Sequence, residues 1–184
     1  MSTSILEKLS IQPASEADLA DIQKLLFEIF QEPQFNQSEK GHTLWERMKT
    51  RYEHDPEKNA RDFWGPDRSR RFAVTVREKG QGNDLVGVAW IMAAAGDTAL
   101  GELNKLYLRK DCRGNGLGKY VLELLLSEAR KLGFTAIYLI TGRELTDAIA
   151  LYQRFGFVDV PQDRYKNSPN SIAMQLDLGT CTAL

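Results

Sequence analysis

One segment of this 184-residue chain restricts its fold more than any other, because a strand, a glycine-rich loop, a helix and a second strand follow one another directly. Residues 102–108 have the character of a strand, residues 116–132 are apolar on most sides of a helix, and residues 136–141 form a short apolar strand. The two strands of such a strand–helix–strand unit are expected to be parallel, with a right-handed connection. The sequence therefore predicts a mixed α/β domain.

Further strands and helices are predicted on both sides of this unit. Strands are expected at residues 9–12, 72–77, 85–95, 157–160 and 172–178, and helices at residues 16–31 and 147–155. Residues 34–70 are harder to interpret, since helical character at 44–52 is followed by a charged stretch with two prolines. This region is either a variable binding region or a solvated cap. We expect a mixed sheet of six to seven strands flanked by about four helices.

Composition and charge limit the classes of function. The length suits a single domain spanning residues 1–184. A net charge of -1 argues against nucleic acid or an anionic membrane surface as a partner. The longest apolar stretch, residues 85–96, is shorter than the approximately 20 residues that span a bilayer, and residues 1–14 show no signal-peptide pattern. We therefore expect a cytoplasmic protein.

The cysteines and histidines predict neither a disulfide scaffold nor a metal site. Cys112 and Cys181 do not form a CxxC pair, and His42 and His54 are too few for a histidine cluster. We expect no bound metal.

The glycine-rich loop has the composition of an anion site: Arg113, Gly114, Asn115, Gly116, Leu117, Gly118 and Lys119. Glycines allow positive φ and the close approach of a ligand to the backbone, and the start of a helix attracts anions. The dinucleotide pattern G-x-G-x-x-G fails because residue 119 is Lys, and the P-loop pattern fails because residue 113 is Arg. A third pattern, [Q/R]-x-x-G-x-[G/A], is met in full by Arg113, Gly116 and Gly118.

On this pattern the sequence resembles the GNAT superfamily of acyl-CoA-dependent N-acetyltransferases, in which the loop holds the pyrophosphate of acetyl-CoA. Residues 148–157 also resemble the A-x-x-x-Y-x-x-x-G-F signature of that family. The resemblance covers about residues 72–160. The alternative interpretation is a structural glycine-rich turn beside an aromatic helix.

The resemblance implies a cofactor site between the strands at 102–108 and 136–141, which run parallel and splay apart in this family. Main-chain groups of Leu106, Tyr107 and Leu108 would bind the pantetheine arm of acetyl-CoA. An N–H group near Leu106 would also stabilise the oxyanion of the tetrahedral intermediate. Residues 113–119 would hold the pyrophosphate.

The resemblance also implies roles in proton transfer. Tyr152 matches the tyrosine that protonates the leaving thiolate, and we favour this role over that of a core aromatic residue with a polar tip. Glu102 is our first candidate for the general base and Glu144 the second, and either could simply face solvent. Many family members have Asn where this chain has Leu145, which puts one cofactor contact in doubt. Cys112 precedes the loop, and we interpret it as incidental because direct transfer needs no enzyme nucleophile.

The expected function is transfer of an acetyl group from acetyl-CoA to a primary amine of a small molecule, such as an amino acid or polyamine. The alternatives are a protein N-terminal or lysine acetyltransferase and a non-catalytic acyl-CoA-binding module. Six aromatic residues could line an acceptor pocket or form a core: Phe30, Phe35, Trp45, Tyr52, Phe63 and Trp64. Homodimers are common among such domains, so a homodimer is also expected, although the sequence indicates no interface.

Overall fold

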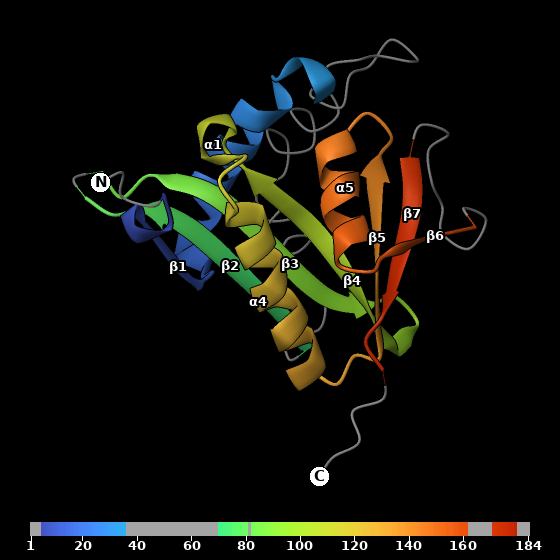
Figure 1. Cartoon of the computed structure of the whole chain (residues 1–184). Coiled ribbons are helices and arrows are strands. Elements are labelled where there is room, and N and C mark those ends of the chain that lie inside the picture. Colours follow the sequence, from blue (N-terminus) through green and yellow to red (C-terminus); the bar gives the residue numbers. More distant parts are fainter. Residues whose placement is uncertain (1–4, 36–69, 81, 162–170, 180–184) are drawn as a thin grey trace, which may run out of the picture. The chain divides into compact units, whose positions relative to one another are not determined.

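The structure is a computed structural model that describes residues 5–35, 70–80, 82–161 and 171–179 (Figure 1). Seven strands among these residues form one sheet in the order β1-β2-β3-β4-β5-β7-β6. They are β1 (Leu9–Pro13), β2 (Arg71–Glu78), β3 (Leu85–Ala94), β4 (Asp97–Leu108), β5 (Ala136–Gly142), β6 (Val158–Val160) and β7 (Ser171–Asp177). The described α-helices are α1 (Leu19–Phe30), α4 (Leu117–Lys131) and α5 (Thr146–Arg154). Short 3-10 turns are η1 (Ile5–Lys8), η2 (Glu16–Asp18), η3 (Pro33–Phe35) and η5 (Lys110–Cys112).

This architecture confirms the predicted mixed α/β fold. β4 and β5 are parallel, whereas β1 pairs with β2, and β7 pairs with both β5 and β6, in antiparallel fashion. The helix expected at residues 44–52 lies outside the described residues. No described helix has both the length and the apolar character needed to cross a membrane.

One predicted boundary is wrong, because β4 begins at Asp97 and not at Glu102. Ala95 and Gly96 form a two-residue turn, in which Gly96 has a φ of 80°. Glycine adopts this positive φ without strain, so the chain reverses at once and no loop separates β3 from β4.

The described residues fall into two compact units, and β2, β3, β4 and α4 contribute residues to both. Unit 1 contains the described residues before residue 70, residues 73–89 and residues 105–118. Unit 2 contains residues 70–72, residues 90–104 and the described residues from 119 onward. The single-domain organisation of residues 1–184 stays a prediction.

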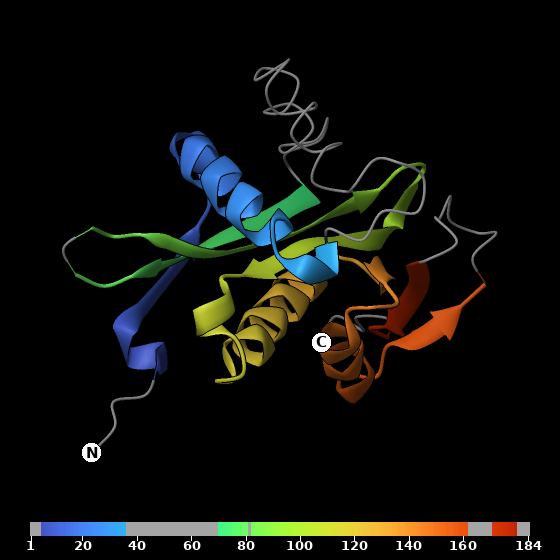
Figure 2. The ribbon, with the colours of Figure 1, turned by 90° about the horizontal axis from the view of Figure 1, so that it is seen from above.

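In unit 1, α1 packs through one apolar face beside β2 (Figure 2). Its buried residues recur at helical spacing: Ile22, Leu25, Leu26, Ile29 and Phe30. Ser15 and Asp18 form a capping box just ahead of the helix. The buried guanidinium of Arg77 on β2 bonds Asp18 at 2.6 Å and Asp21 at 2.8 Å. This ion pair fixes the start of the helix against the strand.

In unit 2, α5 runs alongside β5 (Figures 1 and 2). The register of the strands shows which side chains share a face, because paired residues project to the same side of a sheet. Ile137 on β5 pairs with Leu176 on β7 and with Gly101 on β4. A Cβ atom added at Gly156, just after α5, would lie 3.4 Å from Leu176. The carboxyl end of α5 therefore covers the face that carries Ile137.

Candidate functional site

Strand β4 changes character along its length. Its parallel pairing with β5 covers three residue pairs, from Leu100↔Ala136 to Glu102↔Tyr138, and β5 then continues to Gly142. Lys105, three residues beyond Glu102, has a φ of 46°, which is a left-handed conformation inside a strand. Such a residue interrupts the pleat and redirects the strand, as a β-bulge does.

The glycine-rich loop follows β4 and η5 in unit 1. Gly114 and Gly116 have φ values of 77° and 83°, a region that residues with a Cβ atom rarely adopt. A Cβ atom added at either glycine would meet nothing within 4 Å, so the surface of the loop is open. Leu117 and Gly118 begin α4, and the first N–H groups of an α-helix have no partner within the helix. The loop can therefore receive an anion through its main chain, as the fit to a pyrophosphate requires.

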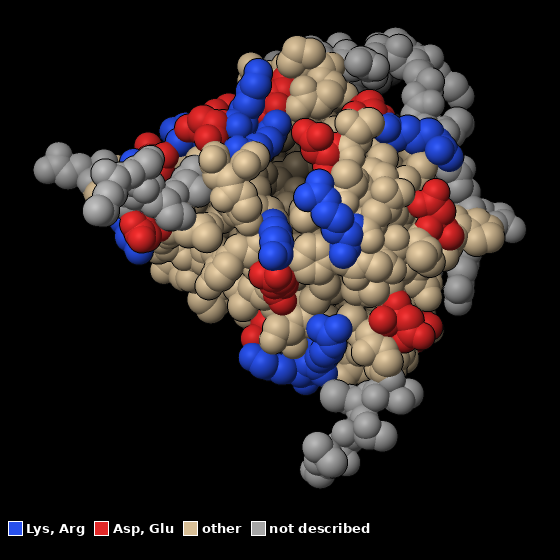
Figure 3. All heavy atoms as spheres, in the orientation of Figure 1, with Lys and Arg blue, Asp and Glu red and all other residues tan. Residues whose placement is uncertain are grey.

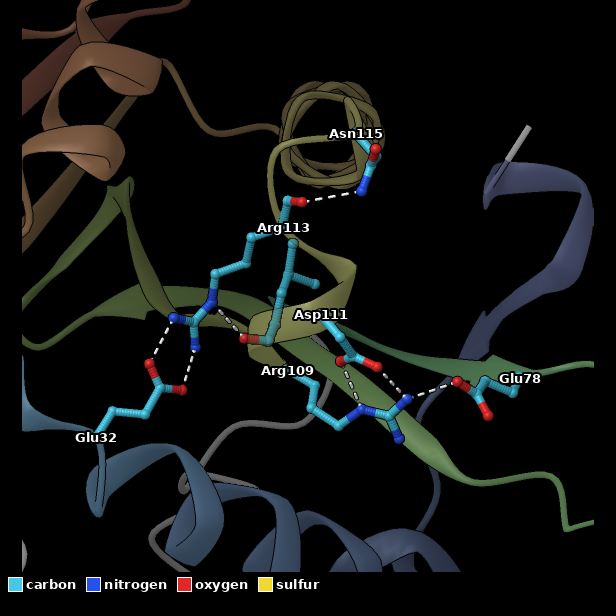
Figure 4. Close-up of polar contacts among 7 residues, drawn as sticks. Glu32, Glu78, Arg109, Asp111, Arg113 and Asn115 are labelled. Atoms are coloured by element: carbon cyan, nitrogen blue, oxygen red, sulfur yellow. Dashed lines mark hydrogen bonds and ion pairs between the residues drawn. The ribbon is translucent and has the colours of Figure 1, made fainter. Parts of the chain in front are cut away.

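The two basic side chains of this loop differ in how they are held. Arg113 binds both carboxylate oxygens of Glu32 at 2.6 Å, and its Nε donates to the carbonyl oxygen of Leu108 at 2.8 Å (Figure 4). Lys119 is 66% exposed and lies 3.7 Å from Glu123. The guanidinium of Arg113 is therefore paired with a carboxylate. Asn115 donates from its side chain to the carbonyl oxygen of Arg113, which braces the turn.

A second guanidinium stabilises the connection just ahead of the loop. Arg109 binds Asp111 through two bonds of 2.7 and 2.8 Å and also binds Glu78 at 2.5 Å (Figure 4). Hydrogen bonds from Arg109 hold the pKa of Asp111 below its ordinary value. Burial raises the pKa of Cys112 to about 11, and the negative charge of Asp111 adds to this shift. The thiol of Cys112 therefore stays protonated at neutral pH and is a poor nucleophile.

The same residues form the group best placed to hold a metal ion in the described part of the chain. Potential ligand atoms of Glu78, Asp111 and Cys112 lie within 4.8 Å of one another. Because the guanidinium of Arg109 already binds both carboxylates, a metal ion would have to displace it. The absence of a metal stays a prediction.

Tyr107, for which only a main-chain role was predicted, also contributes its ring to an aromatic cluster of unit 1. Its ring centroid lies 5.3 Å from that of Phe30 and 6.0 Å from that of Phe35, in edge-to-face geometry. Phe30 and Phe35 are buried, so these two aromatic residues form part of the core of unit 1. Trp45, Tyr52, Phe63 and Trp64 lie outside the described residues.

Leu106 and Leu108 are the other strand residues predicted to bind pantetheine. Leu108 is buried, and its carbonyl oxygen accepts the bond from Arg113. Leu106 is half-buried and follows the left-handed Lys105 directly. The direction of its N–H group therefore depends on the interruption of the strand at Lys105.

In unit 2, the two predicted catalytic residues belong to opposite faces of the sheet. Glu102 is half-buried and pairs with Tyr138, so it shares the face of Tyr138. The neighbouring pair, Gly101 and Ile137, occupies the other face, which the end of α5 covers. Tyr152 lies on α5, and its buried ring packs 5.7 Å from that of Phe157. Glu102 also marks the last pair before β4 and β5 stop pairing.

Burial raises the pKa of Tyr152 to about 12. The phenol is therefore fully protonated at neutral pH, which a proton donor requires. The same shift makes it a weaker acid than an ordinary tyrosine, so donation depends on a thiolate being formed close to it.

The connection between β5 and α5 contains the second candidate base and the residue that departs from the family pattern. Glu144 is exposed, and its carboxylate lies against the position that a Cβ atom at Gly142 would occupy. Leu145 is the N-cap residue of α5, and no described side chain caps this helix. Asn at this position would be a far better cap than Leu.

Figure 3 shows basic and acidic side chains of the described residues interspersed with one another. This distribution agrees with the net charge of -1.

The fold and the loop define a class: an α/β protein in which a glycine-rich turn at the start of a helix follows one strand of a parallel pair. Residues 26–157 match the model of the acetyltransferase (GNAT) family. The chain belongs to this family.

Curated relatives share segments of the sequence. The chain is 37% identical over 75 residues to the uncharacterized N-acetyltransferase YjgM of Escherichia coli, a match that covers 40% of this chain and 45% of that protein. It is 35% identical over 79 residues to the IAA acetyltransferase of Azospirillum brasilense, covering 42% and 52%. The chain thus spans about half of these relatives' length, and 32% of an uncharacterized N-acetyltransferase from Dictyostelium discoideum.

Solved structures share the fold over nearly the whole chain. The PaiA N-acetyltransferase from Thermoplasma acidophilum, in complex with coenzyme A, superimposes with a TM-score of 0.68 at 16% identity and covers 92% of this chain and 98% of that chain. YncA from Salmonella typhimurium, with its cofactor acetyl-CoA, gives 0.62 at 22% identity and covers 96% and 97%.

Two features of the site were missed by sequence reasoning. Glu32, the partner of Arg113, is separated from it by 81 residues, and no local pattern connects the two. The left-handed conformation of Lys105 was missed because lysine is not a residue that signals positive φ.

Proposed function

We propose that this chain is an N-acetyltransferase that transfers the acetyl group of acetyl-CoA to a primary amine of a small molecule, such as an amino acid or polyamine. The observation that carries the proposal is the arrangement of β4, the open glycine loop and α4 in a member of the GNAT family. Within unit 2, the pairing of β4 with β5 ends at Glu102, as expected of a strand pair that splays apart.

The donor would be bound mainly by the protein backbone. N–H groups of the loop and of the start of α4, residues 113–119, would hold the pyrophosphate, and main-chain groups of Leu106, Tyr107 and Leu108 would hold the pantetheine. The open surface at Gly114 and Gly116 supports this assignment, because a ligand can approach the main chain there.

The reaction requires a neutral amine to attack the carbonyl carbon of the thioester. A C–N bond forms, the carbonyl oxygen becomes an oxyanion, and the C–S bond then breaks to release the CoA thiolate. The N–H group near Leu106 would stabilise the oxyanion. A base must take one proton from the amine, and an acid must give one to the thiolate, whose pKa is near 8.5 if it resembles that of cysteine.

Glu102 would be the base, with Glu144 as the second candidate, and Tyr152 would be the acid. The placement of Glu102 and α5 on opposite faces of the strands of unit 2 supports separate roles for the two groups. An acceptor approaching on the Glu102 face and a thiol beside α5 would meet where the strands stop pairing. Such a ternary complex gives the proximity that direct transfer needs.

A small-molecule acceptor is supported by the names of relatives, which include an IAA acetyltransferase and a mycothiol acetyltransferase from Geodermatophilus obscurus that is 32% identical over 80 residues. That second match covers 41% of this chain and 26% of the relative. A protein acceptor and a non-catalytic acyl-CoA-binding module are the competing outcomes of the test. A cytoplasmic location, a homodimer and the absence of a metal are parts of the same proposal.

The first test is thermal unfolding with acetyl-CoA, with desulfo-CoA and NADH as controls. A ligand at about one hundred times its Kd adds about 2.7 kcal/mol, which for this size is about 5–11 °C in Tm. We expect a shift with acetyl-CoA and desulfo-CoA and none with NADH. An unchanged Tm at saturating acetyl-CoA would contradict the proposal.

The second test is thiol release across a panel of small amines and peptides. Turnover of small amines supports the proposal, whereas robust turnover of peptides with none across the amine panel would move the assignment to a protein acetyltransferase. Binding of acetyl-CoA without turnover of either class would favour the binding module.

A further inference from the structure

Arg113 is the charged residue of the loop motif, yet three bonds hold its side chain within unit 1. Nη1 and Nη2 each bind one oxygen of Glu32 at 2.6 Å, and Nε binds the carbonyl oxygen of Leu108 at 2.8 Å (Figure 4). Two parallel bonds of this kind hold a guanidinium in one orientation. Glu32 is itself 14% exposed and accepts a further bond from Gln34, so the carboxylate is also held in place.

These bonds connect three segments that the sequence separates. Glu32 lies just after α1, Leu108 ends β4, and Arg113 begins the glycine loop. Arg113 and Leu108 are five residues apart, so their bond closes the turn between the strand and the loop. Glu32 is not part of that turn but helps to fix it, because it orients the guanidinium of Arg113 that bonds the carbonyl oxygen of Leu108.

We propose that Glu32 is a positioning residue for acyl-CoA binding: through Arg113 it fixes the main chain of Leu108 and of the loop, and the side chain of Arg113 does not itself bind the phosphates. This inference rests on the proposed function of the loop. It assigns recognition of the pyrophosphate to backbone N–H groups and makes a carboxylate essential for binding a polyanion.

The sign of the effect distinguishes this role from simple electrostatics. A carboxylate close to a phosphate site repels the ligand, so its removal would tighten binding if charge alone mattered. If Glu32 positions the loop, its removal weakens binding, because the guanidinium is released and the turn loses its support. The two explanations predict opposite changes in Kd for one substitution.

The test compares the Kd of CoA, measured by calorimetry, for the full chain and three variants. Glu32→Gln removes one charge and the paired geometry, and we expect Kd to rise about tenfold, since charge-assisted hydrogen bonds are strong. Arg113→Lys keeps the charge but cannot make the three bonds, and it should weaken binding by a similar factor. Glu123→Gln is the matched control, because it removes a carboxylate that pairs with the exposed Lys119 and should change Kd less than about twofold.

Kinetics with acetyl-CoA separate positioning from a general loss of structure. Glu32→Gln should raise KM for acetyl-CoA while leaving kcat and the Tm of the unliganded protein close to those of the parent chain. The double variant Glu32→Gln/Arg113→Lys should bind no more weakly than either single variant, because both break one unit.

Each outcome decides the question. Equal or tighter CoA binding by Glu32→Gln overturns the inference, as does near-parental binding by Arg113→Lys, which would mean that the positive charge acts on the phosphates directly. If Glu32→Gln lowers Tm strongly, the Kd of Arg113→Lys provides the decision. If the parent chain itself does not bind CoA, the proposed function fails and the inference fails with it.

Discussion

The connection from β4 to α4 and the connection from β5 to α5 both lead from a strand to a helix, and they are built in different ways. The connection from β4 to α4 is held by charged side chains, with Arg109 binding Asp111 and Arg113 binding Glu32. The connection from β5 to α5 is held by main-chain bonds such as Leu145 N–H to the carbonyl oxygen of Gly142, at 3.1 Å. Within the described residues, no side chain caps α5.

The difference indicates that the two connections serve different roles, one in binding an anion and the other in positioning Tyr152. A site for an anion must present N–H groups in a fixed arrangement, and the charged bonds of the first connection provide that arrangement. The connection from β5 to α5 leads to the helix that carries Tyr152. The proposed role of Tyr152 depends on its buried phenol and not on a fixed loop. Substitutions in the first connection should therefore change binding, and substitutions beyond the second should change turnover.

Tyr152→Phe should give the largest effect, on turnover alone. Loss of the proton donor should lower kcat at least about tenfold, while the Kd of acetyl-CoA stays within about twofold. Thiol release and calorimetry on the same preparation measure the two quantities. Unchanged turnover with any acceptor would show that Tyr152 is not the acid.

Gly116→Ala should affect binding and stability together. A Cβ atom at a φ of 83° costs about 1 kcal/mol and distorts the loop main chain, so CoA should bind several-fold more weakly. Gly118→Ala is the matched control, because Gly118 lies within α4, where alanine is favoured, and the family pattern accepts alanine there. Equal losses in both variants would contradict a role for the left-handed conformation.

Leu145→Asn should strengthen the connection from β5 to α5, because this helix lacks a side-chain cap. Asn at an N-cap accepts a bond from a free helix N–H group, which stabilises the fold by about 1 kcal/mol relative to Leu145→Ala, a variant that loses the same apolar contact without adding a cap. Chemical denaturation measures the difference between the two variants. If they unfold at the same denaturant concentration, Leu145 does not occupy a cap position that a side chain can fill.

Acid should weaken the connection from β4 to α4 more than the connection from β5 to α5. We expect this effect to be smaller than those of the three substitutions above. The pKa of Asp111 is lower in the folded chain than its ordinary value of 3.8, so the carboxylate contributes stability above that pH and loses the contribution as pH falls through the folded value. Because Asp111 is 62% exposed, solvent screening keeps the contribution small. The free energy of unfolding of Asp111→Asn should depend less on pH below pH 4 than that of the parent chain. An identical pH profile would show that this ion pair does not contribute to acid sensitivity.

Much of the fold followed from the sequence because periodicity and glycine are local signals. The spacing of apolar residues predicted α1, α4 and α5, and the glycines at 96 and 116 take the positive φ that only glycine adopts easily. Even so, the start of β4 was misplaced, since residues 97–101 have no strong strand pattern of their own. The tight turn at Gly96 begins this part of the strand, and its last two residues, Leu100 and Gly101, pair with β5.

The sequence by itself determined the order of the elements, the glycine loop at the start of α4 and the family to which the chain belongs. Tertiary structure decided the partner of Arg113, the packing of the Tyr107 ring against Phe30 and Phe35, and the face of the sheet on which Glu102 lies. The physical reason is distance along the chain. A helix or a turn depends on residues within about one turn of each other, whereas an ion pair across 81 residues or a strand register exists only after the chain has folded.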